Sequence, residues 1–223
     1  MTATLASPPK PSNRHVATAA SGAILGGVSW DDYVRFRDDP ANDDVRLTFD
    51  EISGRLEIGM PSGKKHESIA DFLLTLVMEY GRVRRRSVVP VGSTTWRLRG
   101  AGGVEGDKAF HIDRQGDLGL NDNIPKLDAG SPPPDLVIEV DVTSPGVRKL
   151  PIYERIGVPE VWVWDDETIA VHRLIDGRYE VIDQSVVLPN FPLTYAAELV
   201  QARESQPPFE LQEAFERHLR NAG

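Results

Sequence analysis

The chain contains no cysteine, so disulfide bonds, thiolate metal sites and cysteine nucleophiles are all excluded. Histidine is scarce as well, and the five histidines are scattered, which leaves little support for a zinc site. No hydrophobic run approaches the length of a membrane-spanning helix, and residues 1–13 lack the apolar core of a secretion signal. We therefore expect a cytoplasmic protein that makes no contact with a membrane.

Positive charge is also in short supply, because 34 acidic residues outnumber 25 lysines and arginines and the net charge is −9. This balance argues against a nucleic-acid binder, which needs clustered basic side chains to contact phosphates. A basic cluster does occur at residues 82–86, but cations at a solvated helix end are the favoured explanation for it. An acidic chain can still act on nucleic acid where a divalent ion neutralises a cluster of carboxylates.

Length and composition fit one globular domain, since the chain has 223 residues, of which 40% are hydrophobic and 26% charged. Residues 1–27 are rich in Ala, Ser, Pro and Gly and show no hydrophobic period, which predicts a flexible N-terminal tail. The domain itself is expected over residues 28–200, and a helical extension is expected over residues 201–223.

Hydrophobic spacing predicts helices after an N-cap at Ser29 and over residues 66–80, 150–156 and 210–219. Runs rich in β-favouring residues between them predict short strands at residues 46–49, 55–58, 87–90, 94–98, 109–112, 136–142, 160–164, 169–174 and 179–182. The glycines of residues 101–103 favour a hairpin turn. Trp162 and Trp164 share one strand face, where core packing is favoured over base stacking. This order predicts an α/β (α+β) domain with a mixed central sheet flanked by helices.

Acidic side chains gather on one face of the β-rich run from residue 134 to residue 141. Because side chains alternate along a strand, one face is apolar and the other carries Asp135, Glu139 and Asp141. Burying several acids is expensive without a partner, and their hard oxygen atoms suit Mg²⁺ or Mn²⁺. Two interpretations stay open, a metal site and an edge strand with one solvated face.

Lys149 begins the following predicted helix and would bring an ammonium group back to the end of this strand. Two carboxylates on a metal ion with a lysine beside them can bind a scissile phosphate and activate water. Spacing alone allows an ordinary exposed lysine equally well.

Three blocks of sequence resemble the Uma-type family of restriction endonucleases, which belongs to the PD-(D/E)XK nuclease-like superfamily. They are Glu-Gly-Asp-Lys-Ala-Phe-His-Ile (105–112), Pro-Pro-Asp-Leu-Val-Ile-Glu-Val (133–140) and Lys-x-x-x-Tyr-x-x-x-Gly-Val-Pro-Glu-Val-Trp (149–162). The resemblance runs from about residue 30 to about residue 192, and the third block is the most specific. It implies a restriction-endonuclease-like fold and a Mg²⁺- or Mn²⁺-dependent endonuclease that hydrolyses phosphodiester bonds.

The resemblance also implies roles for individual residues. Asp107 and Glu139 would hold the metal ion. Asp141 stands where the superfamily usually has its lysine, so it would add a metal ligand or face water. The lysine role would then pass to Lys149, four residues before the helix tyrosine. Gly106 is a further departure, because relatives commonly have proline before the aspartate.

Lower-ranked candidates surround the start of the long helix, since nucleases of this fold often draw one further acid from it. These candidates are Glu57, His66 and Glu67. For His66, backbone partners at a helix N-terminus are an equally good explanation.

The expected partner is nucleic acid, with DNA favoured, and a homodimer would suit the cutting of two strands. The alternative is a non-catalytic nuclease-fold module that binds protein or DNA, for example as an accessory to a mobile element or a toxin–antitoxin system. The acidic charge favours this alternative, whereas the trio of Asp107, Glu139 and Lys149 favours the enzyme.

Overall fold

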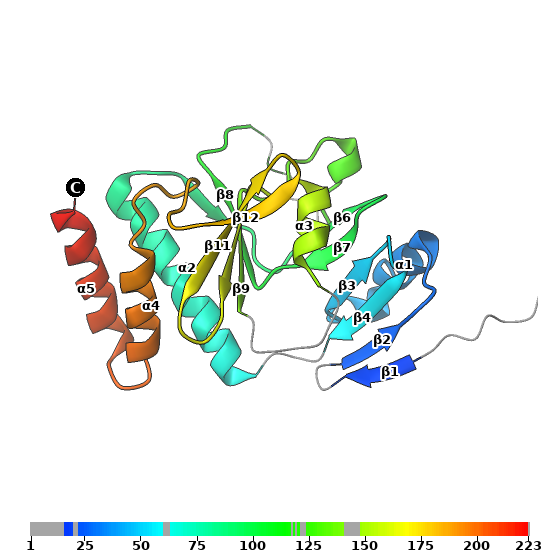
Figure 1. Ribbon diagram of the computed structural model, residues 1–223, viewed down its shortest axis with the longest axis horizontal. Helices are drawn as coiled ribbons and strands as arrows, with labels where there is room; N and C mark the ends of the chain where they lie inside the picture. The colour runs from blue at the N-terminus through cyan, green and yellow to red at the C-terminus, as the bar shows by residue number, and fades with distance from the viewer. Residues whose placement is uncertain are drawn as a thin grey trace, which may run out of the picture.

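The computed structural model describes residues 16–19, 22–59, 63–116, 118, 120, 124–140 and 148–222. In this part of the chain, two six-stranded sheets and five α-helices form the fold (Figure 1). Sheet A has the order β1 (Val16–Ala19), β2 (Gly22–Leu25), β4 (Arg55–Gly59), β3 (Leu47–Asp50), β7 (Gly102–Glu105) and β6 (Thr95–Leu98). Sheet B has the order β12 (Arg178–Ile182), β11 (Ile169–Ile175), β10 (Glu160–Trp164), β9 (Leu136–Val140), β8 (Lys108–Ile112) and β5 (Val88–Pro90). The helices are α1 (Trp30–Arg37), α2 (Lys64–Arg84), α3 (Leu150–Ile156), α4 (Leu193–Ala202) and α5 (Pro208–Asn221).

Strand direction differs between the two sheets. Neighbouring strands of sheet A are all antiparallel. Sheet B is mixed, because β9 and β10 run parallel while its other described pairs run antiparallel. Parallel neighbours need a crossover connection, and the segment that contains α3 supplies it. The predicted mixed α+β class is confirmed, although the structure has two sheets where the sequence suggested one central sheet.

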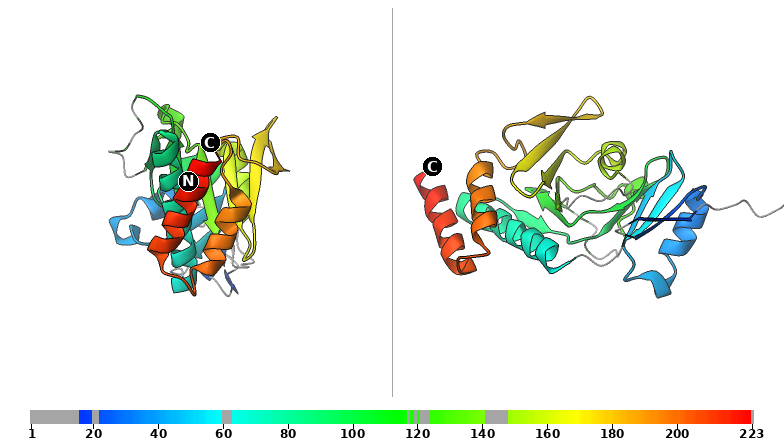
Figure 2. Two further views of the ribbon diagram at one scale, coloured as in Figure 1. Left: turned by 90° about the vertical axis from the view of Figure 1, so that its left-hand side faces the viewer. Right: turned by 60° about the horizontal axis from the view of Figure 1, so that its bottom comes forward.

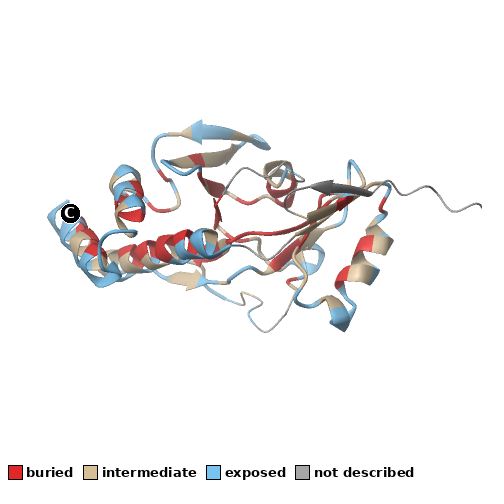
Figure 3. Ribbon diagram, turned by 90° about the horizontal axis from the view of Figure 1, so that it is seen from below, coloured by how far each residue is buried: buried red, intermediate tan, exposed pale blue. Residues whose placement is uncertain are grey.

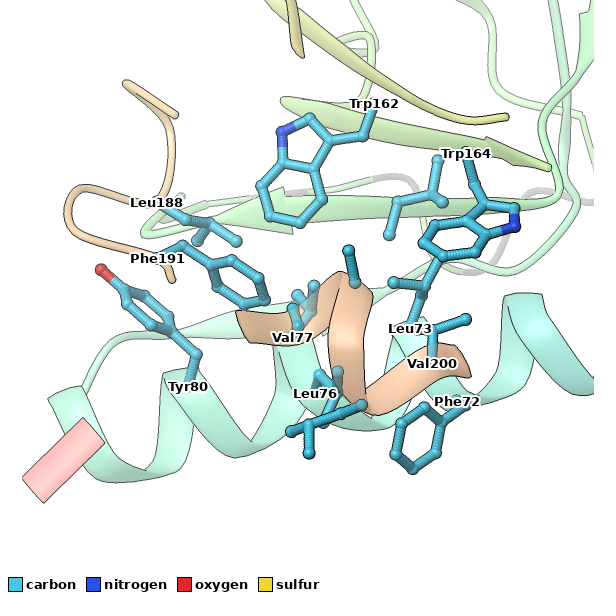
Figure 4. Close-up of a cluster of buried hydrophobic side chains, with 14 of the residues drawn as sticks. Phe72, Leu73, Leu76, Val77, Tyr80, Trp162, Trp164, Leu188, Phe191 and Val200 are labelled. Carbon is cyan, nitrogen blue, oxygen red and sulfur yellow. The ribbon is translucent and has the colours of Figure 1, made fainter. Parts of the chain in front are cut away.

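The main hydrophobic core lies between one face of sheet B and the helices α2, α4 and α5 (Figures 1 and 2). The buried stripe of α2 is visible along its length in Figure 3. Trp162 and Trp164 point from β10 into this core, next to Phe191 and residues of α2 (Figure 4). Both tryptophan side chains are almost completely buried, so the predicted packing role is confirmed.

The opposite face of sheet B packs against α3 and the inner face of sheet A. Val137 and Val161 of sheet B, Trp96 and Val104 of sheet A and Tyr153 of α3 belong to this second core. The outer face of sheet A packs against α1 in a third core, which contains Tyr33, Leu47, Phe49 and Leu56. As a result α3 lies between the two sheets and faces both of them.

Local signals placed most of the helices correctly. The capping box between Ser29 and Asp32 starts α1 as predicted. The C-terminal helix α5 extends the predicted segment by two residues at each end, and α3 coincides with its prediction. None of the described helices combines the length and hydrophobicity needed to cross a membrane.

Two expectations about local structure were wrong, and one helix was not expected. Within the predicted tail, β1 and β2 are strands, and β2 pairs with β4 over four residues. The hairpin turn predicted at residues 101–103 lies at residues 99–101 between β6 and β7, and Gly102 and Gly103 already belong to β7. Glycine is needed at position 103 because the Tyr33 side chain occupies the space that a Cβ would need. The helix α4 was not predicted, and its buried residues join the main core together with those of α5. The domain boundaries themselves stay a prediction.

Candidate active site at the junction of the two sheets

The chain crosses from sheet A to sheet B between β7 and β8, and Asp107 lies at this crossing. The Asp107 side chain is 4% exposed, so its carboxylate is almost completely removed from water. Its Oδ1 lies 2.8 Å from Arg46 Nη2. Its Oδ2 accepts a 2.7 Å hydrogen bond from the Val140 N–H and lies 3.0 Å from His66 Nε2.

These partners keep Asp107 ionised. Burial by itself raises the pKa of a carboxyl group, because it penalises the charged form. The hydrogen bond from His66 and the charges of Lys149 and Arg46 outweigh burial, and they hold the pKa of Asp107 well below its usual range. Asp107 is therefore a carboxylate throughout the neutral range.

Glu139 projects from β9 towards α3, on the strand face opposite the main core. The neighbouring Ile138 and Val140 point into that core, as alternation along the strand requires. Glu139 Oε2 lies 2.7 Å from Lys149 Nζ, and Oε1 accepts a 2.5 Å hydrogen bond from the Tyr153 hydroxyl. Burial and the nearby Asp107 charge raise the pKa of Glu139, and Lys149 and Tyr153 offset this rise only in part.

The helix α3 holds both oxygens of Glu139 with side chains one turn apart. Lys149 is the N-cap residue, Pro151 occupies the first turn, and Gly157 ends the helix in the left-handed conformation. Residues four apart on a helix point the same way, so Lys149 and Tyr153 reach the same carboxylate. Lys149 Nζ also donates a 3.0 Å hydrogen bond to the Glu105 carbonyl, which connects α3 to the end of β7.

The structure thus brings Asp107, Glu139 and Lys149 into one place, the trio that the family resemblance implied, together with the lower-ranked candidate His66 from the first turn of α2. The hydrogen bond with Asp107 raises the pKa of His66, although burial opposes this. Glu67 is the outer neighbour of His66, with 3.7 Å between Oε1 and Nδ1 and half of its side chain exposed. Within the described residues, Glu67 forms no hydrogen bond or ion pair with Asp107 or Glu139.

The structure gives less information on two other predicted candidates, Glu57 and Asp141. Glu57 lies on β4 opposite Thr48 and is partly buried. Leu56 and Ile58 pack on the α1 side, so alternation puts Glu57 on the inner face of sheet A. Asp141 falls in the segment 141–147, outside the described residues.

Sequence reasoning did not select Arg46 or Tyr153 as site residues. Arg46 precedes β3 and is 61 positions from Asp107, and no local pattern links the two. Tyr153 belongs to the third block that resembles the family, residues 149–162, but the sequence assigns it no role in the site. Its spacing from Lys149 was the available signal, because residues four apart on a helix share one face. Gly106 also contributes, since a Cβ there would lie 2.7 Å from Val137 Cγ1 and 3.1 Å from the Tyr153 hydroxyl.

The donor atoms suit a hard divalent cation, because Asp107 and Glu139 offer carboxylate oxygens from two adjoining segments. In the described part of the chain, however, no three His, Asp or Glu side chains are arranged to hold a metal ion. Arg46, His66 and Lys149 instead neutralise the two carboxylates. Binding of an ion would require these cations to move or to share the oxygens.

Comparison with known proteins relates the chain to one family model and to solved structures. Residues 30–198 match the model of the Uma2 family, which is described as "Putative restriction endonuclease". Among solved structures, a chain described as a "putative nuclease belonging to DUF820" from Anabaena variabilis ATCC 29413 has 17% sequence identity and a TM-score of 0.47. That alignment covers 85% of this chain and 99% of the other. No curated protein matches the sequence.

Proposed function

This chain belongs to the Uma2 restriction endonuclease family, and on that premise we propose that it is a Mg²⁺- or Mn²⁺-dependent endonuclease acting on nucleic acid, with DNA as the substrate. The family supports a nuclease-like function in general terms. The observation that carries the specific proposal is the buried pair of Asp107 and Glu139, with Lys149 in direct contact with Glu139.

In this proposal Asp107 and Glu139 hold the metal ion, and Asp141 adds a third carboxylate. A divalent ion in such a site lowers the pKa of water and withdraws negative charge from a phosphate group. The ionised state of Asp107 supports this role, because a ligand must be deprotonated. The raised pKa of Glu139 reflects burial, which an incoming cation would counteract.

Lys149 orients the attacking water or stabilises the negative charge that develops on the phosphate in the transition state. Its position supports this role, because Nζ is anchored on Glu139 Oε2 and the Glu105 carbonyl and therefore points to a fixed place. A fixed cation at the place where charge develops is more effective than a mobile one, since it needs no reorganisation. Cutting two strands would require two such sites, so we also propose that the active form is a homodimer.

A non-catalytic nuclease-fold module is the second candidate. The observation that favours it is that both buried carboxylates are already paired with cations, in a chain of net charge −9. In such a module the ion pairs would be structural, and the fold would serve binding to protein or nucleic acid.

One experiment separates the two candidates. Wild type and Glu139→Ala are incubated with duplex DNA, single-stranded DNA and RNA in the presence of Mg²⁺ or Mn²⁺, and melting temperatures are measured with and without Mn²⁺. We expect metal-dependent cleavage by the wild type and a Mn²⁺-dependent rise in its melting temperature, both lost in Glu139→Ala. Absence of cleavage together with absence of a metal-dependent shift in the wild type would contradict the enzyme and leave the binding module.

A further inference from the structure

Arg46 is the component of the site that comes from sheet A. It directly precedes β3, and its backbone carbonyl accepts a 2.9 Å hydrogen bond from the Gly59 N–H, which ties it to β4. Asp50 of the same strand pairs with Arg155 of α3, so this alternating set of side chains faces α3. Arg46 therefore reaches the site from a backbone that a hydrogen bond to the end of β4 holds in place.

The contacts of Asp107 suggest that Arg46 does more than neutralise this acid. Without Arg46, Asp107 would keep the Val140 N–H and His66 as donors. The Arg46 side chain is 29% exposed, whereas Asp107 beneath it is 4% exposed. A guanidinium group that covers a buried acid and is itself partly exposed can also bind a solute from the solvent side.

Charges on both sides of the carboxylate pair point to the kind of solute. Arg46 forms an ion pair with Asp107 and also interacts electrostatically with Glu139. Lys149 forms an ion pair with Glu139 and also interacts electrostatically with Asp107. Two cations from two different elements thus flank the pair of acids. A phosphate group is the anion that such an arrangement suits, because the planar guanidinium fork matches phosphate oxygens.

We propose that Arg46 binds a phosphate oxygen of the nucleic acid and is thereby a substrate-binding residue of the site, an inference that rests on the proposed nuclease function. The competing interpretation is that Arg46 only positions Asp107. The two differ in a measurable way, since a phosphate contact contributes to the salt dependence of binding and a purely internal ion pair does not.

Arg114 provides a matched control. It is 31% exposed and pairs with the mostly buried Asp135 at 2.7 Å, in the segment that follows the opposite end of β8. The variants Arg46→Gln and Arg114→Gln therefore remove the same charge from the same kind of ion pair. Arg46→Lys is a third variant that keeps the charge at the site but loses the fork.

The test measures binding of fluorescein-labelled duplex and single-stranded DNA in EDTA, as a function of KCl concentration, by fluorescence anisotropy. EDTA prevents cleavage and makes the measurement independent of the metal ion. We expect Arg46→Gln to weaken binding roughly tenfold and to reduce the salt slope by about 1. Arg114→Gln should stay within about twofold of the wild type, and Arg46→Lys should keep the salt slope while weakening binding a few-fold.

The outcomes distinguish this proposal from the proposed function. If the wild type cleaves DNA but folded Arg46→Gln binds it with the affinity and salt slope of Arg114→Gln, Arg46 is only a positioning residue and the nuclease stands. If Arg46→Gln does not fold, wild-type affinity in Arg46→Lys overturns the proposal in the same way. If the wild type neither binds nor cleaves any of the nucleic acids, the nuclease function fails and the role of Arg46 fails with it.

Discussion

Asp107 and Asp135 have the same kinds of partners at two different places in sheet B. Asp107 lies just before β8, and Asp135 lies just before β9. Each carboxylate accepts hydrogen bonds from a backbone N–H and from an arginine, and each lies beside a histidine. For Asp107 these partners are Val140, Arg46 and His66. For Asp135 they are Ile112, Arg114 and His111. In both cases burial raises the pKa and the partners more than reverse it, to about 2 for Asp135 and further for Asp107.

What separates the two regions is a second acid. Asp107 shares its surroundings with Glu139 and Lys149, and its negative charge raises the pKa of Glu139. The side chains that lower the pKa of Asp135 most are those of His111 and Arg114. An arginine and a histidine therefore keep the aspartate ionised both at Asp107 and at Asp135. Only the pair of acids, Asp107 with Glu139, favours the binding of a divalent cation.

The strongest test of this comparison is the pair Asp107→Asn and Asp135→Asn. Both variants keep the shape and most hydrogen-bonding capacity of the side chain but remove the charge. We expect Asp107→Asn to lower metal-dependent cleavage about 10³-fold, since a metal ligand is lost, and Asp135→Asn to stay within about threefold of the wild type. Cleavage rates on one DNA substrate at saturating Mg²⁺ check this, and equal losses in the two variants would erase the distinction.

Lys149→Ala should give the next largest effect. Removal of a fixed cation that stabilises developing charge typically costs about 10²-fold in rate, whereas the two metal-binding acids stay in place. The Mn²⁺-dependent rise in melting temperature should therefore persist while cleavage falls. A suitable control is Lys65→Ala, because Lys65 also lies at the start of a helix but is 61% exposed and pairs with Asp166 at the surface. Full cleavage by Lys149→Ala would remove this residue from the mechanism.

The predictable part of the site is the part that one segment encodes. Alternation along β9 predicted that Glu139 lies on the face away from the apolar one, and the start of α3 offered Lys149 as its neighbour, although spacing alone left an exposed lysine equally open. Asp107 came only from the family resemblance. The pairing of Arg46 with Asp107 depends instead on how sheet A sits against sheet B, which no local pattern records. Composition also misled locally, since glycines are typical of turns, yet Gly103 pairs within a strand and is glycine because Tyr33 leaves no space for a Cβ.

A smaller effect is expected on stability at acidic pH. The folded-state pKa of Asp135 is about 2, below the ordinary value of 3.8, so its contribution to stability is present above the unfolded-state pKa and is lost as pH falls towards 2. After allowance for screening by solvent, this amounts to about 1–2 kcal/mol at neutral pH. Asp135→Asn should lower the free energy of unfolding by that amount at pH 7 and converge with the wild type near pH 2. Urea titrations across this range measure it, and a constant difference at all pH values would contradict the assigned cause.

The smallest expected effect is on the cleavage rate, and it distinguishes a tyrosine bonded to a carboxylate from a tyrosine bonded to a backbone carbonyl. The Tyr153 hydroxyl donates to Glu139 Oε1, and the Tyr179 hydroxyl donates a 2.8 Å hydrogen bond to the Val158 carbonyl. Replacing Tyr179 by phenylalanine removes a hydrogen bond to a neutral carbonyl and should cost about 1 kcal/mol of stability, whereas loss of the bond from Tyr153 to a carboxylate should cost about 2 kcal/mol. Only Tyr153→Phe should also slow cleavage, by a few-fold, because it loosens the carboxylate that Lys149 then holds alone. If Tyr179→Phe slows cleavage to the same extent, the loss follows from stability, and the hydrogen bond from α3 to Glu139 has no separate part in the reaction.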